Sequence, residues 1–195
     1  MSREYHLNQP QTQLTTHLEH RYSDKYGGEV QEGPLYGLIS KIHEPVGVIG
    51  IACPTEYPLL GFVSLVAPAV IRGNTVIAVP SEEHPLSATD LYQVLDTSDL
   101  PGGVLNIVTG SRDVLSKTLV EHQHVDSMWY HVSGEQGVEG SYQIEKRSAS
   151  NMKRTFVSYG QHRDWTCNAQ GEGEEFLQES VEVKNVWVPM GEQYG

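Results

Sequence analysis

The stretch over residues 44–82 constrains the fold more than any other part of this chain. It holds two β-branched apolar runs, residues 45–53 and 76–79, separated by an apolar segment of helical length and a Gly-Asn break. Two runs joined by about a dozen helix-compatible residues predict a strand–helix–strand unit, whose strands are apolar throughout because both of their faces are buried. The crossover in such a unit is right-handed, so the loops after the two strands, residues 53–58 and 80–83, lie at one edge of a sheet. We expect a nucleotide ligand, if the protein binds one, at that edge.

The neighbouring segments continue the alternation of strand and helix. The residue patterns predict strands at 35–43, 104–108 and 125–132, and helices at 58–71, 85–95 and 112–122. This order is typical of an α/β fold with a doubly wound, parallel, Rossmann-like sheet. Pro68 lies inside the first of these helices, where it predicts a kink or a break.

The character of the sequence changes after Ser133. Residues 141–145 and 154–159 alternate as strands with one exposed face, whereas residues 160–175 are rich in Gly and Glu and suggest a loop. Residues 179–188 form the most regular alternation in the chain, with valines interleaved with polar residues. Because a strand of this kind needs a ladder partner, we predict that it pairs with another subunit or with a companion domain.

These patterns divide the chain of 195 residues into three parts. We expect a polar N-terminal helical segment over residues 1–34 and a Rossmann-like domain over 35–140. A small antiparallel β oligomerisation element follows over 141–195. A chain of this length buries a sizeable core in one α/β domain without disulfides or metal ions.

Composition excludes several classes of partner. The formal net charge is -12, which argues against nucleic acid and against an anionic membrane, since both require a basic surface. The two cysteines do not make a disulfide framework, and the chain has no apolar run that spans a bilayer and no signal pattern at its start. We therefore expect a cytoplasmic protein without nucleic-acid or membrane partners.

Several stretches resemble the aldehyde dehydrogenase superfamily, in the order of that family. The most specific is the block that runs from Ala67 to Glu82, with Gly-Asn-Thr-Val followed by Pro-Ser-Glu, which is similar to the NAD-binding domain of the family. Further resemblance is carried by residues 44–50, 58–60, 100–110, 150–160 and 179–188. The resemblance implies a domain of the NAD-binding type, and it implies that residues 179–188 are an oligomerisation strand.

The catalytic residues of the family have no counterparts here. The family's nucleophilic cysteine follows the segment at 150–160, whereas this chain passes from about Asp164 almost directly to the predicted oligomerisation strand, so we expect the catalytic domain to be absent. Glu56 stands where the family has the asparagine that stabilises the oxyanion, and a carboxylate there repels a developing alkoxide. Ser158 stands where the family has its general-base glutamate, and a hydroxyl is a poor base. We expect no catalytic residue.

The cofactor site implied by the resemblance is altered as well. The lysine that contacts the ribose in the family is Val79, although Glu82 is retained. The turn that covers the pyrophosphate in the family carries Val132 in place of a glycine. The cofactor-binding candidates are Ser81, Glu82, Ser133 and Gly134. We expect that the protein requires no cofactor. If it binds one, the resemblance implies NAD.

This pattern is similar to the truncated second unit of the family-16 aldehyde dehydrogenases, which follows a complete dehydrogenase unit. The resemblance implies a homo-oligomer, or pairing with a full aldehyde dehydrogenase unit, through residues 179–188.

Other candidate sites each have a simpler structural interpretation. Cys53 is either a nucleophile or a buried structural cysteine, and no histidine presents itself as its base. His122 and His124 lack a third metal ligand, and a solvated helix end explains them as well. The basic pairs at residues 146–147 and 153–154 form either an anion site or a solvated strand edge.

Three hypotheses follow. The preferred one is a non-catalytic aldehyde-dehydrogenase-like module that acts through assembly or protein partners. The second is a module that binds NAD or another nucleotide without chemistry. The third is an oxidoreductase that uses Cys53.

Overall fold

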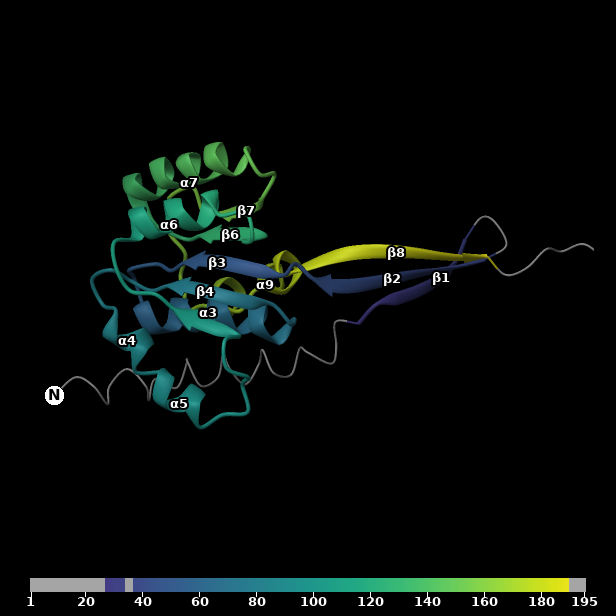
Figure 1. Cartoon of the computed structure of the whole chain (residues 1–195), viewed down its shortest axis with the longest axis horizontal. Helices are drawn as coiled ribbons and strands as arrows, with labels where there is room; N and C mark the ends of the chain where they lie inside the picture. The colour runs from purple at the N-terminus through teal and green to yellow at the C-terminus, as the bar shows by residue number, and fades with distance from the viewer. Residues whose placement is uncertain (1–26, 34–36, 190–195) are drawn as a thin grey trace, which may run out of the picture.

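The computed structural model describes residues 27–33 and 37–189. It consists of an α/β body and a narrow antiparallel sheet that extends away from this body (Figure 1). Within the described residues, no helix is both long enough and apolar enough to cross a membrane.

A five-stranded parallel sheet with the order β5-β4-β3-β6-β7 forms the centre of the body. Its strands are β3 (Val48–Ala52), β4 (Thr75–Val79), β5 (Leu105–Ile107), β6 (Ser127–Tyr130) and β7 (Arg154–Val157). The order reverses beside β3, because the chain moves from β3 to β4 and β5 on one side and then to β6 and β7 on the other. Such a reversal opens a crevice at the carboxyl ends of the strands.

Helices cover both faces of this sheet (Figure 1). Helices α6 (Arg112–Glu121) and α7 (Gly134–Ser148) lie side by side on one face, and α3 (Pro58–Ile71), α4 (Leu86–Thr89) and α5 (Tyr92–Asp96) lie on the other. The predicted fold class, a doubly wound parallel sheet with a small antiparallel sheet, is confirmed. The helix predicted at 85–95 is instead two short helices, α4 and α5.

Helix α3 has the bounds that the sequence predicts. Pro58 occupies its first turn, where the missing N–H has no intrahelical acceptor. The helix continues through Pro68, so the predicted break is absent. Phe62, Leu65 and Ala69 of this helix are fully buried against the sheet, and this packing holds the helix together despite the missing hydrogen bond.

The strand predicted at 141–145 is wrong, because these residues lie in α7. Ser141, Ile144 and Ser148 are buried at the helical spacing, which the apparent alternation of this segment concealed. The segment at 154–159 does contain a strand, but β7 extends the parallel sheet rather than the antiparallel one. The three-part division of the chain stays a prediction; its boundary at residue 140 falls within α7.

The segment between β7 and β8 (Val181–Pro189) is short. The loop predicted there also contains α8 (Asn168–Gly171), and α9 (Glu174–Glu179) begins within it. Helix α9 packs against α3, so this segment covers the same face of the sheet as α3.

The antiparallel sheet has the order β1-β2-β8. Strand β1 (Glu29–Glu32) pairs with β2 (Gly37–Pro45), and β2 pairs with β8 in a continuous register from Gly37 opposite Pro189 to Pro45 opposite Val181. Strand β8 therefore has a ladder partner within the chain. Its other edge has no partner strand among the described residues. The N-terminal helix predicted over 1–34 lies outside the described residues up to residue 26, and Glu29–Glu32 form a strand.

Candidate functional site: two halves of the sheet edge

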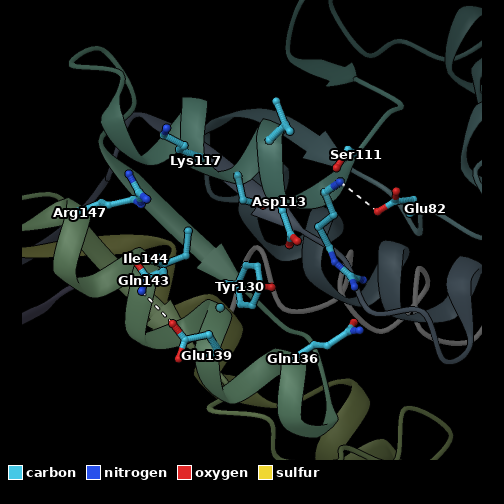
Figure 2. Close-up of a pocket in the computed structure, with 14 residues that line it drawn as sticks. Glu82, Ser111, Asp113, Lys117, Tyr130, Gln136, Glu139, Gln143, Ile144 and Arg147 are labelled. Atoms are coloured by element: carbon cyan, nitrogen blue, oxygen red, sulfur yellow. Dashed lines mark hydrogen bonds between the residues drawn. The ribbon is translucent and has the colours of Figure 1, made fainter.

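A cavity of about 700 Å³ lies between α6 and α7 at the carboxyl edge of the parallel sheet (Figure 2). Its wall combines charged, polar and apolar side chains. In Figure 2, Lys117 and Arg147 lie toward one end of the cavity, Glu82 lies toward the other, and Tyr130 lies between them. The volume of this cavity lies in the range of small-molecule sites, although most of its lining side chains are polar or charged. The crevice expected at the sheet reversal is therefore present.

Glu82, one of the predicted cofactor-binding residues, lines this cavity. It follows β4, and its carboxylate accepts a hydrogen bond from the backbone N–H of Arg112 at 3.2 Å, at the start of α6. Ser81 is fully buried beside it, and its hydroxyl oxygen accepts a hydrogen bond from the N–H of His84 at 3.3 Å. Glu82 is thus part of the cavity wall, whereas Ser81 shapes the turn that carries Glu82.

Arg112 is the residue in the cavity wall that the sequence reasoning missed. Its side chain is only 9% exposed, and one guanidinium nitrogen donates to the Thr55 hydroxyl at 3.1 Å. The guanidinium also lies beside the Tyr130 hydroxyl, where burial raises the pKa of Tyr130 and Arg112 partly opposes that rise. An arginine that opens a helix after a strand is the signal that would have drawn attention to it.

Close packing of α7 on β6 forms the floor of the cavity. A Cβ atom at Gly140 would lie 2.2 Å from the hydroxyl oxygen of Tyr130, and a Cβ atom at Gly137 would lie 1.9 Å from the carbonyl oxygen of Val132. These two glycines therefore let the helix backbone approach the strand directly. Tyr130 fills the gap and presents its hydroxyl beside Arg112.

The other two predicted residues, Ser133 and Gly134, lie at the N-terminus of α7. Ser133 donates a short hydrogen bond to the carboxylate of Glu56, which comes from the loop after β3. Gly134 has a φ of 76°, a conformation that favours glycine, and its N–H donates to the carbonyl of Gly160. Glu56 thus places a negative charge at the helix start, where the helix dipole favours anions. A carboxylate at this helix start disfavours a phosphate group there, because like charges repel.

The space around Glu56 is small. A void of only about 10 Å³ remains there, lined in part by His131, Ser158, Arg163 and Trp165. Such a volume accommodates about one water molecule. Arg163 and Trp165 belong to the segment between β7 and β8. This segment therefore fills one half of the sheet edge, and Ser133 separates that half from the large cavity.

An aromatic cluster underlies the closed half. Trp129, His131, Phe156, Trp165 and Phe176 contact one another with ring centroids 4.6–6.5 Å apart. The guanidinium of Arg163 lies over the Phe176 ring, 4.9 Å from its centroid.

His131 is fully buried in this cluster, and neither ring nitrogen has a hydrogen-bond partner. Burial, with a smaller contribution from the Arg163 charge, lowers the pKa of His131 to about 3. A neutral imidazole without partners does not serve as a proton acceptor for a substrate here.

The remaining candidates have structural roles. Cys53 is fully buried, and burial raises the pKa of its thiol. The rings of His122 and His124 are 5.8 Å apart, and no group of three metal-ligating side chains exists among the described residues. Lys153 is buried rather than on a solvated edge, and its ammonium donates to the carbonyl oxygens of His122 and Val125. Arg154 pairs with Glu179.

Comparison with known proteins places these features in context. The model of the aldehyde dehydrogenase family matches residues 13–179. The betaine aldehyde dehydrogenase of Bacillus subtilis (strain 168) is 33% identical over 139 residues, which cover 71% of this chain and 28% of that protein. The NADP/NAD-dependent aldehyde dehydrogenase PuuC of Escherichia coli (strain K12) is 36% identical over 137 residues, which cover 70% of this chain and 27% of that protein.

Solved structures agree. An indole-3-acetaldehyde dehydrogenase in its apo form superimposes with a TM-score of 0.72 at 29% identity, over 79% of this chain and 36% of the other. PnpE from Pseudomonas sp. WBC-3 superimposes with a TM-score of 0.69 at 28% identity, over 75% of this chain and 29% of the other. The chain thus spans roughly a quarter to a third of the length of the proteins it matches.

Proposed function

Because this chain belongs to the aldehyde dehydrogenase family, we propose that it is a non-catalytic aldehyde-dehydrogenase-like module that serves assembly or protein interaction. The observation that carries the proposal is the closed half of the sheet edge. The positions that resemble the family's oxyanion asparagine and general base hold Glu56 and Ser158, and a void of only about 10 Å³ lies between them and Trp165. A hollow of this volume does not enclose an aldehyde and a nicotinamide ring.

The alternative hypothesis, an oxidoreductase that uses the Cys53 thiol, also lacks support. Cys53 is fully buried, and the desolvated thiol does not ionise at neutral pH. The short segment between β7 and β8 takes the place where the resemblance puts a catalytic domain. For this reason we further propose kinship with the truncated second unit of the family-16 aldehyde dehydrogenases.

A turnover assay tests this proposal. The purified 195-residue chain is incubated with short aliphatic and aromatic aldehydes and with NAD or NADP, and formation of the reduced nicotinamide is followed by absorbance. We expect no turnover above the rate without protein. Turnover by the unaltered chain would overturn the proposal, because it requires an active site. The Cys53→Ala and Cys167→Ala chains would then show whether either thiol takes part, since turnover would disappear in the chain that lacks the thiol used and persist in the other.

Assembly is proposed through residues 179–188. Strand β8 uses one edge for β2, its other edge is open among the described residues, and Val183 and Trp187 are more than half exposed on it. An open edge with exposed apolar side chains favours addition of another strand. The occupant is a second copy of this chain or a full aldehyde dehydrogenase unit.

Light scattering at tens of micromolar measures the assembly. We expect a dimer or larger species that dissociates in Val183→Lys and Trp187→Lys chains, whereas Val30→Lys on β1 leaves the mass unchanged. A monomer that also fails to bind a complete aldehyde dehydrogenase of the family would refute this part of the proposal.

The two free cysteines suit a reducing compartment, and we propose the cytoplasm.

The large cavity favours a second candidate function, which is binding of NAD or another nucleotide without chemistry. Glu82 lines the cavity at the carboxyl edge of the sheet, where nucleotides bind in folds of this class. Calorimetry with millimolar NAD measures this function, and absence of both heat and thermal shift would exclude NAD as the ligand.

A further inference from the structure

Within the described residues, two short links join the α/β body to the antiparallel sheet β1-β2-β8, which we call the arm. Val46 and Gly47 connect β2 to β3, and Ser180 connects α9 to β8. The links lie side by side, because the backbone N–H of Val46 donates to the carbonyl oxygen of Ser180 at 3.4 Å. A change in the direction of the arm relative to the body therefore requires rotation at these links.

One buried side chain of the body bonds to both links. Asn74 is 1% exposed, and its side-chain oxygen accepts a hydrogen bond from the backbone N–H of Gly47 at 2.9 Å. Its side-chain nitrogen donates to the carbonyl oxygen of Ser180 and to that of Ala69 in α3, both at 2.8 Å. Both hydrogens and the oxygen of the amide are thus used, and this one side chain fastens the two links to the end of α3.

The Gly-Asn break in the sequence puts this side chain in place. Gly73 has a φ of 90°, which favours glycine, and its N–H donates to the carbonyl oxygen of Val70 at the end of α3. Directly after Asn74, the N–H of Thr75 donates to the carbonyl oxygen of Gly47 at 2.9 Å. The Gly-Asn pair therefore ends a helix, and the residues that follow Gly73 hold Gly47 at both its N–H and its carbonyl group.

A second side chain holds the link at Ser180 from the other side. One guanidinium nitrogen of Arg154 in β7 donates to the carbonyl oxygen of Val181 at 2.8 Å, and the other pairs with the Glu179 carboxylate at 2.9 Å. Glu179 ends α9 and Val181 begins β8, so Arg154 bridges the link. Because the Arg154 side chain is partly exposed, we expect it to hold the arm less firmly than the buried amide does.

Beyond the links, the arm extends away from the body (Figure 1). Successive residues of a strand point to opposite faces, so Ile42 lies on one face of the arm, and Val183, which is opposite His43, lies on the other. Both side chains are exposed, so neither face of the arm is covered at this point. The direction of the arm therefore depends on the two links and on the side chains that hold them.

The length of the arm amplifies any rotation at the links. The nine residues of β8 span about 30 Å, so a rotation of about 10° moves the end of the arm by about 5 Å. This displacement equals about one spacing between paired strands. A partner strand on the open edge of β8 therefore requires an arm of fixed direction, because ordering a mobile arm opposes association.

We propose that Asn74, together with Arg154, fixes the direction of the arm and in this way positions β8 for assembly. The inference rests on the assembly role proposed above and names the residues of the body on which that role depends. The direction of the arm is measured within a single chain, so this inference and the assembly role fail in separate experiments.

Distances between two spin labels in the full chain test the proposal. One label is attached at Lys117→Cys on the exposed side of α6 and the other at Glu32→Cys on the arm, with Cys167→Ser to prevent labelling there, since Cys53 is fully buried. The labelled chain is diluted in excess unlabelled chain, so that each measured pair lies within one chain. We expect one narrow distance distribution, and a distribution at least about 2-fold wider in Asn74→Ala, because rotations of about 10° move the arm label by about 5 Å.

Val76→Ala is the matched control for a general loss of stability. Val76 is fully buried in β4, two residues after Asn74, and it belongs to the core of the body. We expect this variant to unfold more easily and to keep the narrow distribution. A narrow distribution in Asn74→Ala, or equal widening in both variants, would overturn the proposal.

A second pair of variants tests the other anchor. Arg154→Gln is expected to widen the distribution less than Asn74→Ala does, whereas Arg147→Gln, which breaks the pair with Glu121 on the body, should leave it narrow. An unchanged distribution in Arg154→Gln would contradict the proposal, and this variant decides it should Asn74→Ala fail to fold.

Light scattering over a concentration series links the anchors to assembly. We expect Asn74→Ala to raise the dissociation constant by about 10-fold and Val76→Ala to change it by less than about 2-fold, because only the first variant frees the arm. Equal dissociation constants in the two variants would show that assembly does not depend on the direction of the arm. Should the unaltered chain be a monomer, the distance distributions alone decide whether the two residues fix the arm.

Discussion

The two halves of the sheet edge, one on each side of Ser133, differ in the space that they leave and in how closely their side chains pack. Between α6 and α7 a cavity of about 700 Å³ stays open, and the Nε atom of the buried Arg112 in its wall has no hydrogen-bond partner. Beyond Ser133 the space is only about 10 Å³, and aromatic rings are packed against one another. The closed half gains stability from buried apolar area, and it loses the room that a substrate needs. The open half retains a local conflict, the buried guanidinium of Arg112, which forms no ion pair within the described residues. Such conflicts are expected at functional sites rather than in parts that only support the fold.

The largest expected effect comes from emptying the closed half. Phe176 is fully buried and contacts Trp129, His131, Phe156 and Trp165. Phe176→Ala should lower the free energy of unfolding by about 3–5 kcal/mol, because it removes transfer energy and leaves a void in a close-packed cluster. Urea denaturation measures this loss.

The control for that variant lies in the open half. Val114 lines the large cavity and is 62% exposed. Val114→Ala should change the free energy of unfolding by no more than about 0.5 kcal/mol. Comparable losses in the two variants would contradict the contrast between a packed half and an open half.

A medium effect is expected where α7 approaches β6. A Cβ atom at Gly137 meets backbone atoms of Val132 and Gly160, which do not move aside, while a Cβ atom at Gly140 meets the end of the Tyr130 side chain. Gly137→Ala should therefore destabilise the protein by about 1–3 kcal/mol despite the helix preference of alanine.

Gly140→Ala should cost less, because Tyr130 can shift into the cavity. Thermal unfolding of both variants checks the order. A larger loss for Gly140→Ala would mean that the cavity floor is as rigid as the backbone contact.

Much of the fold was predictable because its signals are local. The strand–helix–strand unit, the bounds of α3 and the parallel character of the sheet follow from apolar runs that are buried on both faces. The assignment of 141–145 to a strand failed because these residues alternate like a strand with one exposed face, whereas Ser141, Ile144 and Ser148 are buried at the helical spacing of α7.

The candidate site was harder to predict because its parts converge only in three dimensions. Glu82 was found from a resemblance, and the structure places it in the cavity wall. Arg112 was missed, because its lack of a counter-ion depends on which side chains surround it after folding. The closure of the other half depends on Trp165, which lies in the segment 160–175 whose composition suggests a loop, and on Phe176, which directly follows that segment.

The effect that we expect to be smallest near neutral pH concerns acid stability, and it tests the closed half through His131. Burial lowers the pKa of His131 from 6.5 to about 3, and Arg163 contributes. Between these values the unfolded chain binds a proton that the folded chain does not. The stability from neutral His131 is therefore complete above about pH 6.5 and is lost as the pH falls toward 3, with a slope of at most about 1.4 kcal/mol per pH unit.

His131→Leu should remove this part of the slope while it preserves the apolar packing. Urea denaturation at several pH values between the two pKa values measures the slope in each chain. His124→Gln, which changes an exposed histidine, should leave the slope as it is in the unaltered chain. An unchanged slope in His131→Leu would show that water or a charge reaches the imidazole, and the closed half would then be open to small polar ligands.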